Sequence, residues 1–141
     1  MKKGKTVALV CTVLMVFAPS AFASVQLPSQ RPVQGTWLNP SGIVAVRTGD
    51  CAGQLCGWVS WASPGALQDA KDSGIDRLIG TELLENYRAV GPQTWKGTVF
   101  VPDMGHRFSS TITQLGGTEL KISGCVLGGM LCKSQTWHRS A

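Results

Sequence analysis

The stretch WKGTVFVPDMGHRFSSTITQLGGTELKIS, residues 95 to 123, contains three short runs in which apolar and polar residues alternate. The apolar members are Trp95, Val99 and Val101 in the first run, Phe108 and Ile112 in the second, and Leu120 and Ile122 in the third. Because successive side chains of a β-strand point to opposite faces of the sheet, each run has one apolar face. Turn-forming residues separate the runs, which predicts three consecutive antiparallel strands.

The rest of the chain continues this pattern of short strands and turns. Residues 43–46 and 55–61 are apolar runs on either side of a turn and read as a hairpin, and residues 130–139 return from a second turn. The chain from residue 35 onward therefore contains seven or eight strands in sequential order. A single sheet of sequential strands hides both of its edges when it closes. We predict an all-β fold, a small antiparallel up-and-down β-barrel of about eight strands.

The two ends of this barrel domain carry residues suited to closing it. Gly35-Thr36-Trp37 opens the first strand, and Arg139 ends the last strand. These strands are neighbours in a closed barrel, so the Arg139 guanidinium can lie over the Trp37 indole, a cation–π contact of about 0.5 to 2 kcal/mol. A Gly-x-Trp motif with a terminal arginine resembles the lipocalin and wider calycin pattern.

The segment Ile75 to Tyr87 is ambiguous. Its apolar residues fit the spacing of a helix, but Gly80 within it weakens that interpretation, so helix and strand both stay open. The preceding residues, Asp69 to Gly74, read as a polar loop. They do not form a calcium loop, because Lys71 falls at the third ligand position.

The first 23 residues are typical of a cleavable secretory signal peptide. A lysine-rich start, an apolar run over residues 7–16 and Ala21-Phe22-Ala23 follow in the expected order, and the run is shorter than the roughly 20 residues of a membrane span. We expect residues 24–34 to form a leader segment and residues 35–141 to form a single barrel domain. The predicted location is the periplasm or the extracellular medium, with no transmembrane segment after cleavage.

Composition disfavours nucleic acid as a partner. Three of the thirteen basic residues leave with the signal, so ten remain against eight acidic residues and the mature net charge is about +2. No run of lysine and arginine remains that would form a nucleic-acid footprint or a polybasic membrane patch.

Four cysteines remain after cleavage, an even number that favours structural disulfides in an oxidising compartment. Four cysteines allow three pairings. We favour Cys51 with Cys56 and Cys125 with Cys132, because each pair brackets a glycine-containing turn and opposed hairpin residues lie within the roughly 7 Å that a disulfide needs. The spacing does not fit a redox or zinc motif, so no metal and no cofactor are expected.

No catalytic motif is present in the sequence, and we assign no catalytic residues. The weakest of three functional hypotheses is an enzyme that uses His106 with Asp103 or Arg107. His138 alternates with Trp137 on the last strand and reads as a solvent-facing residue.

The inward apolar faces suggest the leading hypothesis, a carrier that holds a small hydrophobic molecule inside the barrel. The candidate ligand-binding residues are Trp95, Val99, Phe108 and Ile112. An eight-stranded barrel has room for either a plug of side chains or one small ligand, so the strand count does not choose between them. The alternative is a cell-envelope module that binds another protein without catalysis.

Several short motifs together resemble the bacterial domain-of-unknown-function family 2147. They are Gly35-Thr36-Trp37 with Pro40 and Gly42, Leu55-Cys56-Gly57 with Cys51 and Trp61, Trp95-Lys96-Gly97, Pro102 to Gly105 with Phe108-Ser109, and Gly124-Cys125 through to Gln135-Thr136-Trp137-His138-Arg139. The resemblance implies an exported protein with a calycin-like barrel and no established activity. It also favours a loop followed by a strand for residues 75–87.

Overall fold

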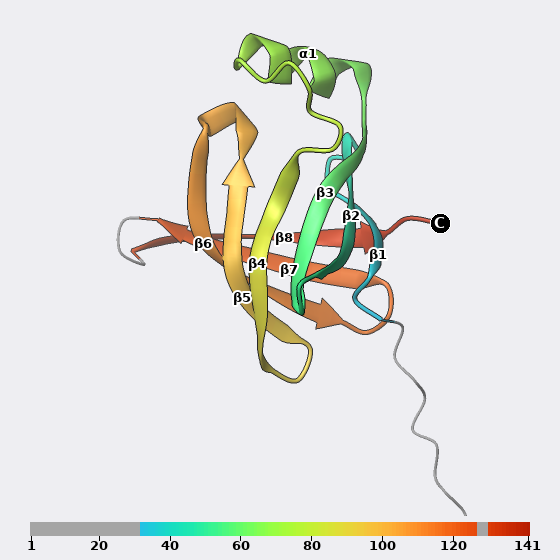
Figure 1. Cartoon of the computed structure of the whole chain (residues 1–141), viewed down its shortest axis with the longest axis vertical. Coiled ribbons are helices and arrows are strands. Elements are labelled where there is room, and N and C mark those ends of the chain that lie inside the picture. The colour runs from blue at the N-terminus through green and yellow to red at the C-terminus, as the bar shows by residue number, and fades with distance from the viewer. Residues whose placement is uncertain (1–31, 127–129) are drawn as a thin grey trace, which may run out of the picture.

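The structure, a computed structural model, describes residues 32–126 and 130–141. The predicted signal peptide and residues 24–31 of the predicted leader lie outside the described residues. The chain forms a closed antiparallel barrel of eight strands in sequential order (Figure 1). The strands are β1 (Gly35–Leu38), β2 (Val44–Cys51), β3 (Gln54–Ala62), β4 (Glu82–Gly91), β5 (Thr94–Val101), β6 (His106–Leu115), β7 (Glu119–Val126) and β8 (Leu131–Arg139).

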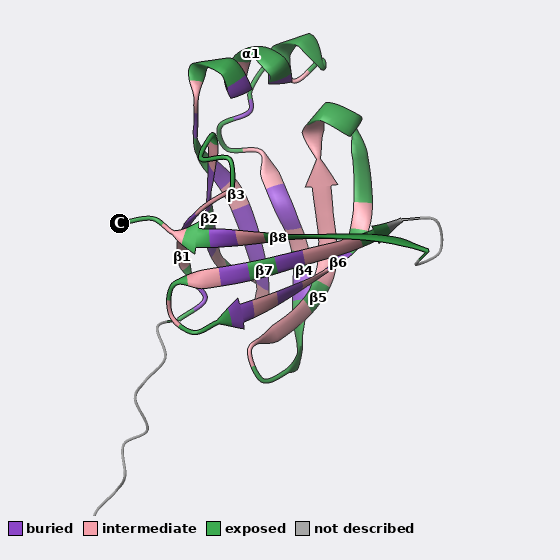
Figure 2. Cartoon of the chain, turned by 180° about the vertical axis from the view of Figure 1, so that it is seen from behind, coloured by how far each residue is buried: buried purple, intermediate pink, exposed green. Residues whose placement is uncertain are grey.

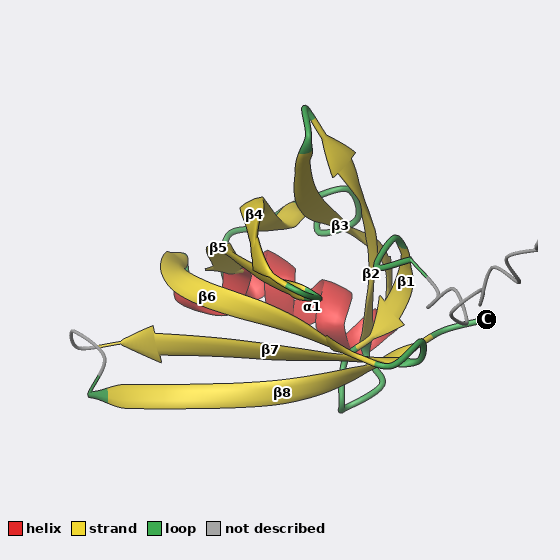
Figure 3. Ribbon diagram, turned by 90° about the horizontal axis from the view of Figure 1, so that it is seen from below, coloured by secondary structure: helices red, strands yellow, loops and turns green. Residues whose placement is uncertain are grey.

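Strand pairing closes the barrel between the first and last strands. Each strand pairs with the next, and β1 pairs with β8 at Trp37↔Arg139 and Leu38↔His138. This confirms the predicted up-and-down barrel of about eight strands. The pairing of β6 with β7 ends at Ser110↔Gly124, and the far part of the β7–β8 hairpin projects beyond the neighbouring strands (Figure 3).

The inward faces of the strands form the core, seen as purple bands along the strands in Figure 2. The largest fully buried side chains include Trp37, Leu84, Tyr87, Ile112 and Leu120. A glycine makes room for one of them, since a Cβ atom at Gly97 would lie 2.6 Å from Cγ of Tyr87 and 2.8 Å from the backbone oxygen of Glu85. The tyrosine ring therefore packs directly on the backbone of β5.

A helix that the sequence analysis missed lies between β3 and β4. Helix α1 (Pro64–Asp72) begins after Ser63, whose hydroxyl accepts a hydrogen bond from the Ala66 N–H at 3.2 Å. Ala66 and Ala70, one turn apart, are buried in the core cluster. The prediction of a polar loop from Asp69 to Gly74 is therefore wrong for Asp69–Asp72. The buried positions of this helix are alanines, which contrast weakly with the surrounding polar residues, and Leu67 packs beside them only partly buried.

The ambiguous segment proves to be a loop followed by a strand. Residues 75–81 form the loop, and β4 begins at Glu82. Register shifts in the β3–β4 pairing let Leu83 and Leu84, adjacent in sequence, both be buried. Asn86 has a positive φ of 53° next to Tyr87. Such irregularities break the alternation of a regular strand, and this produced the helix-like spacing of the apolar residues.

The two ends of the barrel differ. Because the strands alternate in direction, the β2–β3, β4–β5 and β6–β7 turns gather at one end, which we call the closed end. At the other end, the open end, α1 lies across the barrel next to the short 3₁₀ turn η1 (Pro102–Met104) (Figure 1). Within the described residues, no helix is both long and apolar enough to cross a membrane.

Candidate functional site

The closed end is sealed by the Trp37 and Arg139 side chains. The indole Nε1 of Trp37 donates to the Val33 carbonyl at 3.1 Å and to the Thr48 hydroxyl at 3.0 Å. The guanidinium carbon of Arg139 lies 4.2 Å from the centre of the Trp37 ring, as the sequence analysis expects. Arg139 also donates to three backbone carbonyls, those of Gly117, Pro32 and Gln34. The last residues of the predicted leader are thus tied to the barrel.

The four candidate ligand residues all lie on the inward face of the β5–β6 hairpin. Trp95 pairs with Ile112, and Val99 pairs with Phe108. The first pair lies toward the closed end, where Ile112 is fully buried in the core. The second pair lies toward the open end, and both of its side chains are partly exposed. Trp95 is partly exposed as well, so of these two pairs only Val99 and Phe108 are both partly exposed.

Two buried hydroxyl groups lie between these pairs, and the sequence analysis identified neither. Ser110 is opposite Gly97 in the register, and the Tyr87 ring packs on Gly97. Tyr87 is fully buried and Ser110 is 6% exposed, and the two hydroxyls are close enough to act on each other electrostatically, but neither meets the geometry of a hydrogen bond with any described residue. The sequence signal was Gly97, whose missing side chain leaves space for a large neighbour across the strands.

The environment of Tyr87 keeps its phenol neutral. The pKa of Tyr87 is raised to about 12, chiefly by burial; the neighbouring Ser110 hydroxyl acts in the opposite direction, and the charge of Glu85 contributes a smaller part of the rise. At physiological pH the phenol is thus a hydrogen-bond donor and not a base. Two neutral hydroxyls within an apolar wall are suited to binding a polar group on an otherwise apolar molecule.

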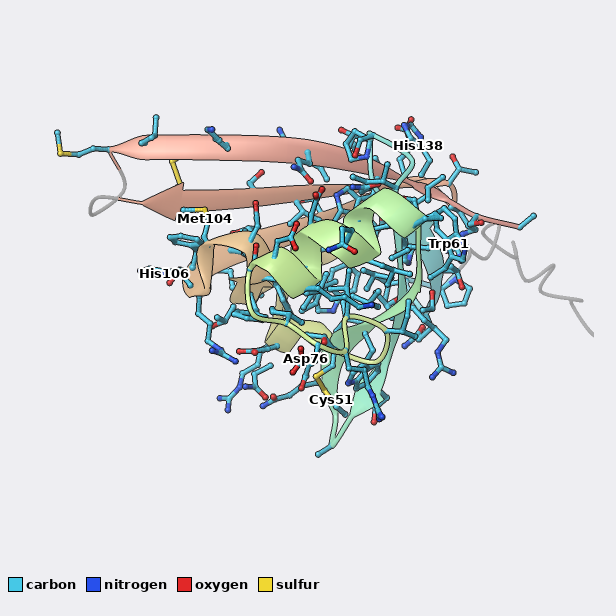
Figure 4. All side chains as sticks on the ribbon, turned by 90° about the horizontal axis from the view of Figure 1, so that it is seen from above. Cys51, Trp61, Asp76, Met104, His106 and His138 are labelled. Atoms are coloured by element: carbon cyan, nitrogen blue, oxygen red, sulfur yellow. A yellow bond between two sulfur atoms is a disulfide. The ribbon has the colours of Figure 1, made fainter. Side chains whose placement is uncertain are left out.

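The structure does not gather the residues of the enzyme hypothesis into one cluster. His106 Nδ1 lies 2.7 Å from the Met104 carbonyl oxygen at the rim of the open end (Figure 4). Arg107, next in sequence, points to the outer face, where its Nε lies 3.0 Å from a carboxylate oxygen of Glu85. Among the described residues, no hydrogen bond joins His106 to Asp103 or Arg107. His138 forms a salt-bridge contact of 3.4 Å with Glu119 when it is protonated.

Both predicted disulfides are confirmed. Cys51 bonds to Cys56 and Cys125 bonds to Cys132, with Cα–Cα distances of 5.9 and 4.0 Å. The Glu82 carboxylate lies within 4.8 Å of both sulfur atoms of the first disulfide. The three groups are close enough together to resemble a metal site, but two sulfurs joined in a disulfide have no thiolate with which to bind a metal.

A hollow lies on the outer wall of the barrel, away from the residues that the sequence analysis selected. It is a surface cleft of about 590 Å³ between β2, β3 and the loop before β4. Its lining residues are Arg47, Trp58, Val59, Ser60, Ile79 and Gly80. They come from three separate segments, so no local motif marks them.

Comparisons with known proteins agree with this geometry. The model of the family described as "Uncharacterized protein conserved in bacteria (DUF2147)" matches residues 35–139. Among solved structures, the chain is similar to protein HP1028 from Helicobacter pylori, described as a member of the lipocalin family, with a TM-score of 0.62 and 15% sequence identity over 79% of this chain and 84% of that chain. At this identity the similarity shows the fold alone. No curated protein matches the sequence. The chain belongs to the bacterial family DUF2147, as its motifs indicated, and folds as a lipocalin-like barrel.

Proposed function

We propose that this protein is a carrier that binds a small hydrophobic molecule with one hydrogen-bonding group in the open half of its barrel. The observation that carries the proposal is the pair of buried hydroxyls on Tyr87 and Ser110, which meet the geometry of a hydrogen bond with no described residue and lie beside an apolar, partly exposed wall. The wall consists of Val99, Val101 and Phe108, whose side chains share the inward face of β5 and β6.

The energetics favour such a ligand. A buried hydroxyl without a partner costs about 1 to 3 kcal/mol, and a ligand atom that accepts from Tyr87 or donates to Ser110 removes part of that cost. The apolar body of the ligand would cover the partly exposed wall, which contributes roughly 25 cal/mol for each Å² removed from water. The hydroxyls therefore confer selectivity, and the wall contributes affinity.

Helix α1 is the cover of this site. It lies across the open end, and its side chains that contact the core cluster are the small, buried Ala66 and Ala70 and the partly buried Leu67. The helix is joined to the barrel by the segments on either side of it. Entry of a ligand would proceed past α1 and η1.

The proposed site of action is the periplasm or the extracellular medium. Two disulfides are typical of proteins in an oxidising compartment. The order of charged, apolar and small residues in the first 23 positions supports export by a cleaved signal peptide. Mass spectrometry of the exported protein would give the mass of residues 24–141 with two disulfides, and retention of residues 1–23 would contradict this proposal.

A second candidate function, an envelope module that binds another protein, rests on the projecting β7–β8 hairpin. Met130 and Leu131 at its far end are 88% and 50% exposed, and the Cys125–Cys132 disulfide braces the strands beside them. Exposed apolar side chains on a braced protrusion are suited to insertion into a partner. If this function is correct, replacing both residues with serine abolishes co-purification of an envelope protein that the wild type retains.

The carrier proposal is tested by native mass spectrometry, with organic extraction, of the protein gently purified from its own compartment. We expect a stoichiometric hydrophobic molecule. Delipidated protein is then titrated with the fluorescent probe N-phenylnaphthylamine, a neutral apolar molecule with one N–H group. Val99→Trp fills the open half and should abolish binding, while the matched control Val90→Trp, at an exposed position on β4, should leave binding intact. A clean apo mass and equal probe binding by both variants would refute the carrier proposal.

A further inference from the structure

The cleft on the outer wall of the barrel has the features of a second ligand site, independent of the barrel interior. Its volume of about 590 Å³ lies within the range of small-molecule sites, roughly 300 to 1,000 Å³. The loop that precedes β4 runs beside β3 (Figure 1), and its residues Ile79 and Gly80 line one side of the cleft. The β-sheet itself separates the cleft from the interior, because Val59 and Gly57 turn toward the core while Trp58 and Ser60 face outward.

Backbone hydrogen bonds hold the two sides of the cleft together. The Gly80 N–H donates to the Val59 carbonyl at 2.8 Å, and the Val59 N–H donates to the Thr81 carbonyl at 2.9 Å. Ile79 is therefore held next to β3. On the other side, a Cβ atom at Gly49 would lie 3.4 Å from Cζ3 of Trp58, so the indole lies against a glycine that leaves it room. The apolar walls of the cleft are thus preformed.

The charge of the cleft comes from Arg47. It lies directly opposite Trp58 in the β2–β3 register and is exposed. Arg47 has no hydrogen bond, ion pair or ring contact with any residue in ranges 32–126 and 130–141, whereas Arg107 and Arg139 are both engaged. A guanidinium has five N–H donors arranged to match a carboxylate.

The acidic residue nearest in register does not cancel this charge. Glu82 lies opposite Trp58 on the side away from Arg47, and its carboxylate is within 4.8 Å of the Cys51 and Cys56 sulfurs. These cysteines lie toward the closed end, whereas the cleft opens toward Ser60 and Ile79. The polar contribution of Ser60 is smaller, since its hydroxyl donates to the Ala45 carbonyl at 3.3 Å and retains lone pairs to accept a hydrogen bond.

We propose that this cleft binds a small, flat organic carboxylate, with its ring between Trp58 and Ile79 and its carboxylate on the Arg47 guanidinium. The indole and the 41% exposed isoleucine supply two apolar surfaces for a planar group. The unpartnered arginine supplies the specificity for an anion over a neutral analogue. This ligand is distinct in charge and in place from the neutral molecule proposed for the barrel.

The test uses naphthoate as the anionic probe and naphthamide as its neutral analogue, with binding followed by calorimetry and by the indole N–H signals in an NMR spectrum. We expect naphthoate to bind with a shift of the Trp58 signal, to weaken as salt rises, and to bind about tenfold more tightly than naphthamide. Arg47→Gln should weaken naphthoate binding about tenfold and remove the preference over naphthamide.

Two further variants make the result specific to the cleft. Arg77→Gln removes the same charge from an exposed residue outside the lining of the cleft, and it should leave binding unchanged. Val99→Trp, which blocks the barrel interior, should also leave naphthoate binding unchanged even if the carrier proposal is wrong. The proposal is overturned if Arg47→Gln binds naphthoate like the wild type, or if Val99→Trp abolishes its binding. Urea denaturation of each variant establishes that the fold is intact.

Discussion

Replacing Tyr87 with phenylalanine should stabilise the protein, although Tyr87 is fully buried and lies at the centre of the barrel. The ring would keep its packing on Gly97, while the hydroxyl that lacks a hydrogen-bond partner would be removed. Since a buried, unpartnered hydroxyl costs about 1 to 3 kcal/mol, the free energy of unfolding at neutral pH should rise by an amount in that range. Most substitutions of fully buried residues act in the opposite direction.

The same substitution should remove a loss of stability at alkaline pH. The pKa of Tyr87 is raised to about 12 from its ordinary value of 10.0, chiefly by burial. Between these two values the unfolded chain releases the phenolic proton and the folded chain retains it, so stability falls as pH rises. One pKa unit corresponds to about 1.36 kcal/mol, so the loss due to this group approaches about 2 to 3 kcal/mol as the pH passes the folded pKa. At pH values below the unfolded pKa, Tyr87 is protonated in both the folded and the unfolded chain, so its ionisation causes no loss of stability.

The assay benefits from the fact that Tyr87 is the single tyrosine in the sequence. Its tyrosinate absorbance reports the ionisation directly, with an expected midpoint of about 12 in the folded protein and near the ordinary value in urea. Urea denaturation of the wild type and Tyr87→Phe at neutral and alkaline pH then measures both effects. Ser110→Ala is the companion variant. A Tyr87→Phe protein that is less stable by more than about 1 kcal/mol would show that the phenol is hydrogen-bonded and refute the reasoning.

Three further predictions concern stability, each measured by urea denaturation of the variant and the wild type. Gly97→Ala should cost several kcal/mol of stability or prevent folding, because its Cβ would lie 2.6 Å from a tyrosine ring atom. The control Gly91→Ala places its Cβ with no atom within 4 Å and should change stability by no more than about 0.5 kcal/mol. Equal effects of the two substitutions would contradict the close packing at Gly97. Arg139→Gln should cost about 2 to 4 kcal/mol through the lost cation–π contact and carbonyl hydrogen bonds, and a loss below about 1 kcal/mol would contradict its role in closure. Replacing Cys125 and Cys132 with serine should cost about 2 kcal/mol, because the disulfide closes a short loop, and an unchanged midpoint would contradict the estimate.

The features that the sequence predicted correctly depend on local patterns. Alternation over residues 95–123 identified the inward faces of three strands, because each of those strands is regular over its described length. Both disulfides could be paired because each joins the two strands of one hairpin. The opposition of Trp37 and Arg139 followed from the closure of a sequential sheet.

The features that it did not predict depend on contacts between distant segments. The buried residues of α1 are Ala66 and Ala70. Their alanine side chains do not stand out in the sequence, and only their contact with the barrel identifies them as a buried face. The position of Tyr87 depends on an irregular β4 and on a glycine in the neighbouring strand. Arg47 looks like any surface arginine until the structure shows that it borders a cleft and has no partner within the described part of the chain.

The tie between the two ends of the domain has a consequence for how fast the protein folds. Arg139 reaches backbone carbonyls more than a hundred residues away along the chain, at Gln34 and Pro32. A contact of such long sequence separation forms only after a large loop has lost its conformational entropy, so barrels of this kind fold in milliseconds to seconds. Because local hairpins such as β5–β6 need little loop closure, we expect them to pair early and the β1–β8 seam to form last. Until that seam forms, both of its strands have exposed edges, and a chain that folds in a crowded compartment is most prone to pair with another copy during that interval.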